Sequence, residues 1–198
     1  MITLSGAVKR WTGDGSKTAF PHSLKCAGLS CDAGNFEIRV DNEVITSGAT
    51  LTDVALVFSS APADEAVIEL WRTAELEPYE KERFPVSYGA STETRDDIGR
   101  VLDNWANKRG GTFWYFGMVF ELAPQETVDA LTQLVAAGPT TEYPMVLLWD
   151  DGREYEVVFA DKAGEDKCKF DESFMDLDSG ERLFKGVVAL LDINKIEN

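Results

Sequence analysis

Residues 35–45, NFEIRVDNEVI, alternate apolar and polar side chains, and this pattern decides the class of the fold. Phe36, Ile38 and Val40 fall on one face of an extended chain, whereas charged side chains fall on the other. The Asp-Asn pair at 41–42 follows directly and marks a turn. The stretch therefore predicts an antiparallel sheet with one buried face.

Short β signals flank this stretch on both sides. Residues 54–58 and 66–72 are rich in strand-forming side chains, and a Gly-Asp-Gly turn lies between Trp11 and Phe20. The two glycines supply the positive φ values that a hairpin reversal needs. Because no helical period appears in this part of the chain, we expect residues 1–75 to form an antiparallel β-sandwich or barrel.

Residues 73–91 have a different composition from the strands before them. They combine two prolines and clustered charges with Tyr79, Phe84 and Tyr88, which predicts an extended arm rather than a regular element. Two interpretations remain open at this point. The arm is either a solvated linker or a strap whose aromatic rings bury against a neighbouring surface.

An amphipathic helix is expected next, with its cap at Ser91 or Thr92 and its end at the glycine pair 110–111. The apolar side chains of one face repeat at helical spacing: Ile98, Val101, Leu102 and Trp105. Such a stripe is more often a core or subunit contact than a cofactor site. Arm and helix together occupy residues 76–111.

Residues 112–198 predict a compact α+β domain. The apolar run 112–122 is expected as a buried strand, and a helix follows between Pro124 and Gly138. The helix should turn four side chains inward: Val128, Leu131, Leu134 and Val135. An Asp-Asp-Gly hairpin at 150–152, a charged loop and a closing strand at 183–193 complete the domain. The whole chain is therefore expected to be α+β and mainly β.

Composition excludes several classes of protein. The chain has 198 residues and 44% apolar residues, enough for a packed core. With 19 basic against 35 acidic side chains the net charge is −16, which argues against nucleic acid as a partner. No run approaches the roughly 20 apolar residues that span a bilayer, and the N-terminus lacks the apolar core of a signal peptide. We expect synthesis in the cytoplasm and no membrane contact.

Residue types that bind metals are present, but their spacing matches no standard metal-binding pattern. His22, Cys26 and Cys31, with Cys168 as a distant fourth, include the residue types that bind zinc, but both CxxC pairs are missing. Residues 176–181 partly match a calcium loop, although the bidentate Glu that closes such loops is absent. We therefore expect no metal and no cofactor, and reduced rather than disulfide-bonded cysteines.

Catalytic motifs are not found either. The sequence contains no GxSxG, P-loop or HExxH pattern, and His22 has no nucleophile with an orienting third group near it. Carboxylate pairs such as the one at 150–151 are expected by chance in so acidic a chain. The sequence therefore favours a protein that is not an enzyme and has no catalytic residues.

Several segments, taken in order, carry a resemblance to a known family. They include GDGSKTAFPHSL, FEIRVDNEVI, LVFSSAPADEAVIELWRTAEL and RFPVSYGASTETRDDIGRVLDN. Over residues 8–104 this order resembles the N-terminal attachment domain of short-tailed phage tail-fibre proteins. The matching positions are Gly13, Gly15, Phe20, Val40, Asp41, Phe58, Ala61, Pro62, Trp71, Arg72, Thr73, Phe84 and the helix at 98–102. Asn42 departs from the family, which has Gly there.

The resemblance implies a structural role in the virion. The protein would act in the tail or baseplate as an adaptor that joins tail components or anchors fibres, and it would be made in the host cytoplasm. In element order alone, residues 112–198 resemble the small modules of phage tail tips and distal-tail proteins. The implied partners are tube, hub or fibre proteins and further copies of this chain in a cyclic assembly. We expect the following side chains to form the interface: Trp11, Phe20, Tyr79, Phe84, Tyr88 and Trp105.

Two other functions remain as alternatives. A carbohydrate-binding or receptor-binding module would use exposed aromatic rings as platforms for sugars. A cell-wall hydrolase would need two carboxylates on either side of a cleft, about 5 to 10 Å apart. The sequence favours the binding module over the hydrolase.

Overall fold

The computed structural model describes residues 1–24, 36–88, 94–95, 101–102, 111–160, 168–175, 182–194 and 196. Within these residues the fold is α+β and mainly β, as the sequence predicts. The first part contains β1 (Ile2–Asp14), β2 (Ala19–Pro21), β3 (Phe36–Val40), β4 (Glu43–Val44), β5 (Ala49–Leu51), β6 (Ala55–Phe58) and β7 (Asp64–Leu76). The rest contains β8 (Glu80–Tyr88), β9 (Thr94–Arg95), β10 (Val101–Leu102), β11 (Gly111–Pro124), α2 (Gln125–Ala137), β12 (Met145–Leu148), β13 (Glu154–Phe159), β14 (Cys168–Met175) and β15 (Arg182–Asp192).

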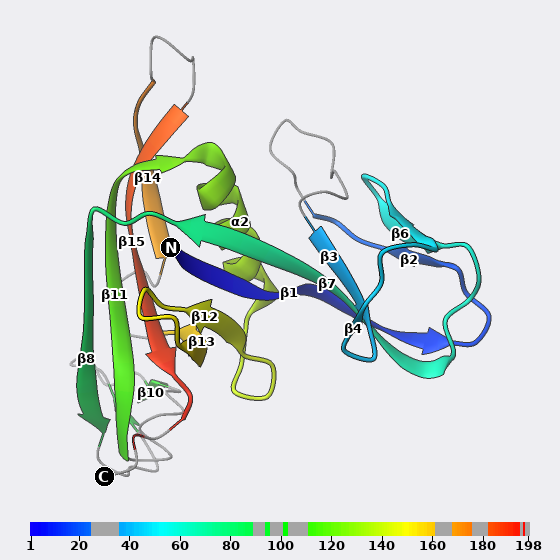
Figure 1. Ribbon diagram of the computed structural model, residues 1–198, viewed down its shortest axis with the longest axis horizontal. Helices are drawn as coiled ribbons and strands as arrows, with labels where there is room; N and C mark the ends of the chain where they lie inside the picture. Colours follow the sequence, from blue (N-terminus) through cyan, green and yellow to red (C-terminus); the bar gives the residue numbers. More distant parts are fainter. Residues whose placement is uncertain are drawn as a thin grey trace.

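One antiparallel sheet runs through most of the described chain. Its strand order is β4-β3-β7-β1-β12-β13-β15-β11-β8, and β14 also pairs with β15. Because β1 pairs with β12, the sheet continues across the predicted divisions at residues 75 and 111. In the described residues β4 and β8 are the outermost strands of this order, so the sheet does not close into a barrel. The pair β1 and β7 runs from one lobe of the molecule to the other (Figure 1).

β1 lies near the middle of the main sheet, and its first half was not predicted as a strand from the sequence. Ile2, Leu4, Gly6 and Val8 are buried while Thr3, Ser5 and Ala7 are partly exposed, which is the alternation of a half-buried strand. β1 pairs with β7 from Ile2 opposite Leu76 to Asp14 opposite Asp64. Both strands are 13 residues long, and their ladder connects the two lobes.

The N-terminal lobe is sandwich-like. A small sheet of order β2-β6-β5 contributes Phe20 and Leu56 to the same buried cluster as Ile38 and Ile68 of the main sheet. The predicted hairpin at the Gly-Asp-Gly turn is wrong, because β2 pairs with β6 and not with β1. The turn instead carries the chain from one sheet to the other, with Gly15 at a φ of 69°.

The turn predicted at 41–42 is confirmed, and it closes a β-hairpin. Residues 36–40 and 43–44 pair as β3 and β4. Asp41 and Asn42 have φ values of 52° and 67°, which a two-residue turn of this kind requires at both positions. Asn adopts this left-handed conformation more readily than most other residues with a side chain, so it serves at position 42 where glycine is the usual choice.

The extended arm is a regular element, contrary to the prediction. Residues 80–88 form β8, which pairs with β11 from Tyr88 opposite Gly111 to Glu80 opposite Val119. Pro85 is accommodated because β8 pairs with only one neighbour, and an outer strand tolerates the missing N–H group. The prolines and charges that indicated a linker are therefore those of an edge strand.

The predicted helix at 91–110 is wrong where the structure describes it. Val101 pairs with Arg95 and Leu102 with Thr94, as a two-stranded ladder. Thr94 and Val101 are β-branched, and such residues favour strands over helices. The remaining residues of the predicted helix, Ile98 and Trp105 among them, lie outside the described residues.

The C-terminal predictions hold with two exceptions. The strand at 112–122, the helix after Pro124, the hairpin around 150–152 and the closing strand are all present. α2 buries Val128, Leu131 and Leu134, but Val135 is exposed. The predicted charged loop contains β14, which pairs with β15. α2 contacts β1 and β7 as well as β11, β14 and β15, so the sheet curves around the helix.

No helix in the described part of the chain has the length and hydropathy of a membrane span.

Candidate functional site

An exposed sheet surface lies on the side of β8, β11, β15 and β14 that faces away from α2. On the inner side, Phe116, Met118, Phe120, Val188 and Leu190 belong to the core. Because side chains alternate along a strand, the residues between these face the other way. On that side Tyr115 and Leu191 are buried in a second cluster with Phe113 and Ala160, so only part of it is exposed. We call this surface the outer face and define it by its exposed or partly exposed side chains: Glu80, Glu82, Gly117, Val119, Lys169, Val187 and Ala189.

One row of the outer face crosses all four strands. Glu80 lies opposite Val119, Val119 lies opposite Val187, and Val187 lies opposite Lys169. Val119 is 39% exposed and Val187 is 43% exposed, although both occupy strand interiors. The row therefore places an acid at one end, two exposed valines in the middle and a base at the other end.

A hollow of about 1000 Å³ lies beside this row. It forms because the next row contains Gly117 opposite Ala189, whose small side chains leave the sheet uncovered. A Cβ atom on Gly117 would lie 2.8 Å from Oε1 of Glu82, so the Glu82 side chain extends over the glycine. Tyr79, which is 69% exposed, lies at the border of the hollow. The surface is apolar, hollowed and bordered by charge.

The predicted interface residues do not form one surface. Tyr79 belongs to the hollow, and Phe84 packs its ring against Tyr115 with 4.8 Å between centroids. Tyr88 ends β8, and its side chain lies outside the described residues, as does all of Trp105. Trp11 and Phe20 lie in the other lobe.

Trp11 and Phe20 serve the packing of that lobe. Phe20 is 4% exposed, and its ring lies 6.1 Å from Trp11 and 5.7 Å from Phe58, centroid to centroid. The indole N–H of Trp11 donates to the carbonyl of Pro21 at 3.2 Å. With so little exposed area, Phe20 offers almost nothing to a partner.

Two ion pairs hold β8 to the β12–β13 turn. Lys81 pairs with Asp150, and Arg83 donates to Oδ2 of Asp151 at 2.7 Å and to the hydroxyl of Tyr155 at 2.7 Å. The guanidinium of Arg83 lowers the pKa of Asp151, and the carboxylate raises the pKa of Arg83. The paired carboxylates of the turn are thus engaged in holding an edge strand, a contact that sequence spacing does not reveal.

A second charged network covers the β1–β7–β3 surface. The Glu69 carboxylate is buried, pairs with Arg10 and accepts the indole N–H of Trp71 at 2.8 Å. Arg10 stacks on the ring of Tyr143 and Arg39 on that of Trp71, at 4.0 and 3.8 Å from the centroids. Because each charge has a counter-charge or a ring against it, this network stabilises the strand ladder.

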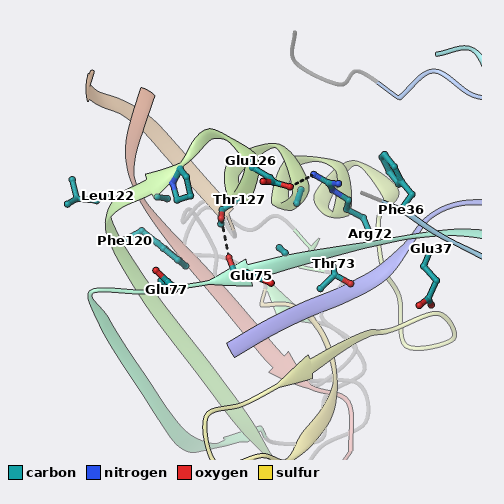
Figure 2. A pocket seen from close by; sticks show the side chains of 14 residues that line it. Phe36, Glu37, Arg72, Thr73, Glu75, Glu77, Phe120, Leu122, Glu126 and Thr127 are labelled. Atoms are coloured by element: carbon teal, nitrogen blue, oxygen red, sulfur yellow. Dashed lines mark hydrogen bonds and ion pairs between the residues drawn. The ribbon is translucent and has the colours of Figure 1, made fainter. Parts of the chain in front are cut away.

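A groove of about 720 Å³ lies where β11 leads into α2 (Figure 2). Arg72 is 6% exposed, and burial lowers its pKa while Glu126 and Asp129 act to raise it. Nη2 of Arg72 lies 3.8 Å from Oε1 of Glu126, and the Thr127 hydroxyl donates to the Glu75 carbonyl at 3.1 Å. These contacts fix the start of α2 on β7.

The residue types that raised the question of zinc are not brought together within the described residues. Nε2 of His22 lies 2.9 Å from the carbonyl oxygen of Thr52, and Cys168 lies in β14. Cys26, Cys31 and the loop at 176–181 lie outside the described residues. In the described ranges no three His, Cys, Asp or Glu side chains come together in an arrangement that could hold a metal ion.

Cys168 is expected to be an unreactive thiol. Burial raises the pKa of its thiol to about 12, so almost none of it is thiolate at pH 8, and the thiolate is the reactive form. In a Cys26→Ser, Cys31→Ser background, we expect a chromogenic disulfide reagent to label Cys168 at least about 100 times more slowly in native protein than in denaturant. Equal rates in both conditions would contradict this placement.

No protein-family model, curated protein or solved structure matches this chain.

Proposed function

We propose that this chain is a structural protein of a phage tail or baseplate, an adaptor that joins tail components or anchors fibres. The observation that carries the proposal is the outer face, where Val119 and Val187 are exposed in the middle of a regular sheet. Contiguous apolar side chains rimmed by charge are typical of surfaces that bind other proteins. Burying this face against a neighbour would stabilise an assembly without any chemical step.

The arrangement of the two lobes suits a joining role. β1 and β7 pair along almost their full length and extend from the sandwich-like lobe to the lobe that carries the outer face (Figure 1). The ladder between them continues along the link, with register shifts at Val8 and Gly13. Such a link would keep the outer face at a fixed distance from any partner of the other lobe.

The sequence resemblance supports the same proposal through its strands. The positions that carry it around Phe20, Val40, Phe58 and Arg72 lie in β2, β3, β6 and β7. The family's helix is a departure, because Val101 and Leu102 form a strand here. The resemblance therefore supports the role of the N-terminal lobe more than that of the segment that follows.

Immunogold electron microscopy of particles from the source lysate tests the proposal. With an antibody raised against the purified chain, we expect gold at one point of the tail and none on the capsid. Particles from a deletion strain that carries the empty complementation plasmid serve as the control. Intact tails without label in the wild-type lysate would contradict a virion role.

A further inference from the structure

We infer that the outer face binds the outer face of a second copy, around a two-fold axis that runs along the strands between β11 and β15. The inference names the partner of the surface on which the proposed function rests. It is carried by the order of charges along the row from Glu80 to Lys169. The two-fold operation makes this row complementary to itself.

The register of the strands gives the complementarity. The four strands stand about 4.8 Å apart, so the midpoint of the row falls between Val119 and Val187. Rotation by 180° around an axis that runs along the strands, about 5 Å above that midpoint, places Glu80 of one copy over Lys169 of the other. The same rotation places Val119 of each copy over Val187 of its neighbour. One operation therefore produces two ion pairs, one on each side of an apolar centre.

Packing distances allow these contacts. Sheets that pack face to face lie about 10 Å apart, a gap that the side chains of both faces fill together. Two pairs of facing valines, Val119 over Val187 in each direction, form the apolar centre, while Glu and Lys are long enough to meet across the gap. Other orientations lose this match, because an axis perpendicular to the strands would place Glu80 over Glu80.

The free edge of β8 is a poorer candidate for self-association. Pro85 removes one hydrogen-bond donor, and Glu80, Lys81, Glu82 and Arg83 place four charged side chains in succession along the strand. Prolines and charges are the features by which edge strands avoid pairing with another chain. The exposed valines lie on the face and not along this edge, so the face is the surface that gains from burial.

The net charge of −16 opposes association at long range, and it sets the conditions for observing the dimer. At about 0.15 M salt the screening length is about 8 Å, so repulsion between distant acids is largely removed. Contacts buried between the two faces are screened much less. The dimer should therefore be measured at physiological salt rather than in dilute buffer.

Sedimentation equilibrium of charge-reversal variants tests the pairing. We expect the wild-type chain to dimerise at micromolar to millimolar concentration. Glu80→Lys and Lys169→Glu should each lower the association constant at least about tenfold, because each places like charges opposite one another. The double variant Glu80→Lys, Lys169→Glu should recover most of the affinity. Glu43→Lys on β4 is the matched control, since it changes the net charge equally on an exposed strand elsewhere.

Mixing the two single variants provides the most stringent test of the pairing. A Glu80→Lys chain carries two lysines in the row and a Lys169→Glu chain carries two glutamates, so the mixture should form heterodimers more tightly than either variant forms homodimers. A wild-type chain that stays monomeric at millimolar concentration would overturn the inference, as would mixed variants that fail to associate. Tail labelling by antibody does not depend on dimer formation, so that outcome would leave the proposed virion role standing.

Discussion

Phe116→Ala should lower the free energy of unfolding by about 4 kcal/mol, the largest effect we expect from a truncation in this chain. Phe116 is fully buried in β11, and its ring lies 5.0 Å from Trp149 and 4.9 Å from Tyr155, centroid to centroid. Removal of the ring leaves a cavity between strands that are distant in sequence. Urea denaturation followed by tryptophan fluorescence measures the loss.

Phe84→Ala is the matched control for this truncation. Phe84 lies on the paired strand β8, but it is 37% exposed and its main aromatic contact is Tyr115. We expect a loss of about 1 kcal/mol, because solvent already reaches part of the ring. Equal losses for the two variants would contradict the assignment of Phe116 to the core.

Gly186→Ala should cost about 3 kcal/mol, because no atom fits beyond the Cα of this glycine. Gly186 lies between Phe120 and Phe170 on neighbouring strands, and those rings meet over it with 5.5 Å between centroids. A Cβ there would overlap the Phe170 ring and the backbone carbonyl of Lys169. Backbone cannot move aside cheaply, so β14 would have to separate from β15.

Gly117→Ala tests the same substitution where the obstacle is mobile. The nearest atom to an added Cβ is the terminal carboxylate oxygen of Glu82 at 2.8 Å, and a side-chain rotation relieves it. We expect a change of less than about 1 kcal/mol, since alanine also reduces the entropy cost of a glycine in a strand. Thermal unfolding of the two variants side by side, by circular dichroism, gives the comparison. A Gly186→Ala variant as stable as Gly117→Ala would contradict the packing of the two rings.

Local patterns in the sequence predicted local structure well. The turn between β3 and β4 was foreseen from alternation and the Asp-Asn pair, and α2 from its apolar period, Pro124 and Gly138. Each of these depends on residues that are close in sequence, so propensity and capping determine them. The apolar stripe was misleading at Val101 and Leu102, because helical spacing and a short strand compete in short apolar segments.

The outer face could not be predicted in the same way. Its central row joins Glu80, Val119, Lys169 and Val187, which come from four strands spread over half of the chain. Only the register of the β8–β11, β11–β15 and β14–β15 ladders brings them into line. One signal was present: the continuous apolar run at 112–122 indicates a strand with apolar side chains on both faces. α2 covers one of those faces. On the other, Phe113 and Tyr115 are buried in a second cluster, and Val119 stays exposed for a partner.

Incorporation of face variants into particles tests most directly whether the outer face joins this chain to its neighbours. A strain lacking the gene would be complemented with wild-type protein, with Val119→Asp or with Val44→Asp, which changes another exposed valine, on β4. Purified particles would then be probed with the antibody after circular dichroism has shown that both variants fold. We predict wild-type levels of Val44→Asp protein and almost no Val119→Asp protein in the particles. Equal incorporation of Val119→Asp would contradict the outer face as the joining surface.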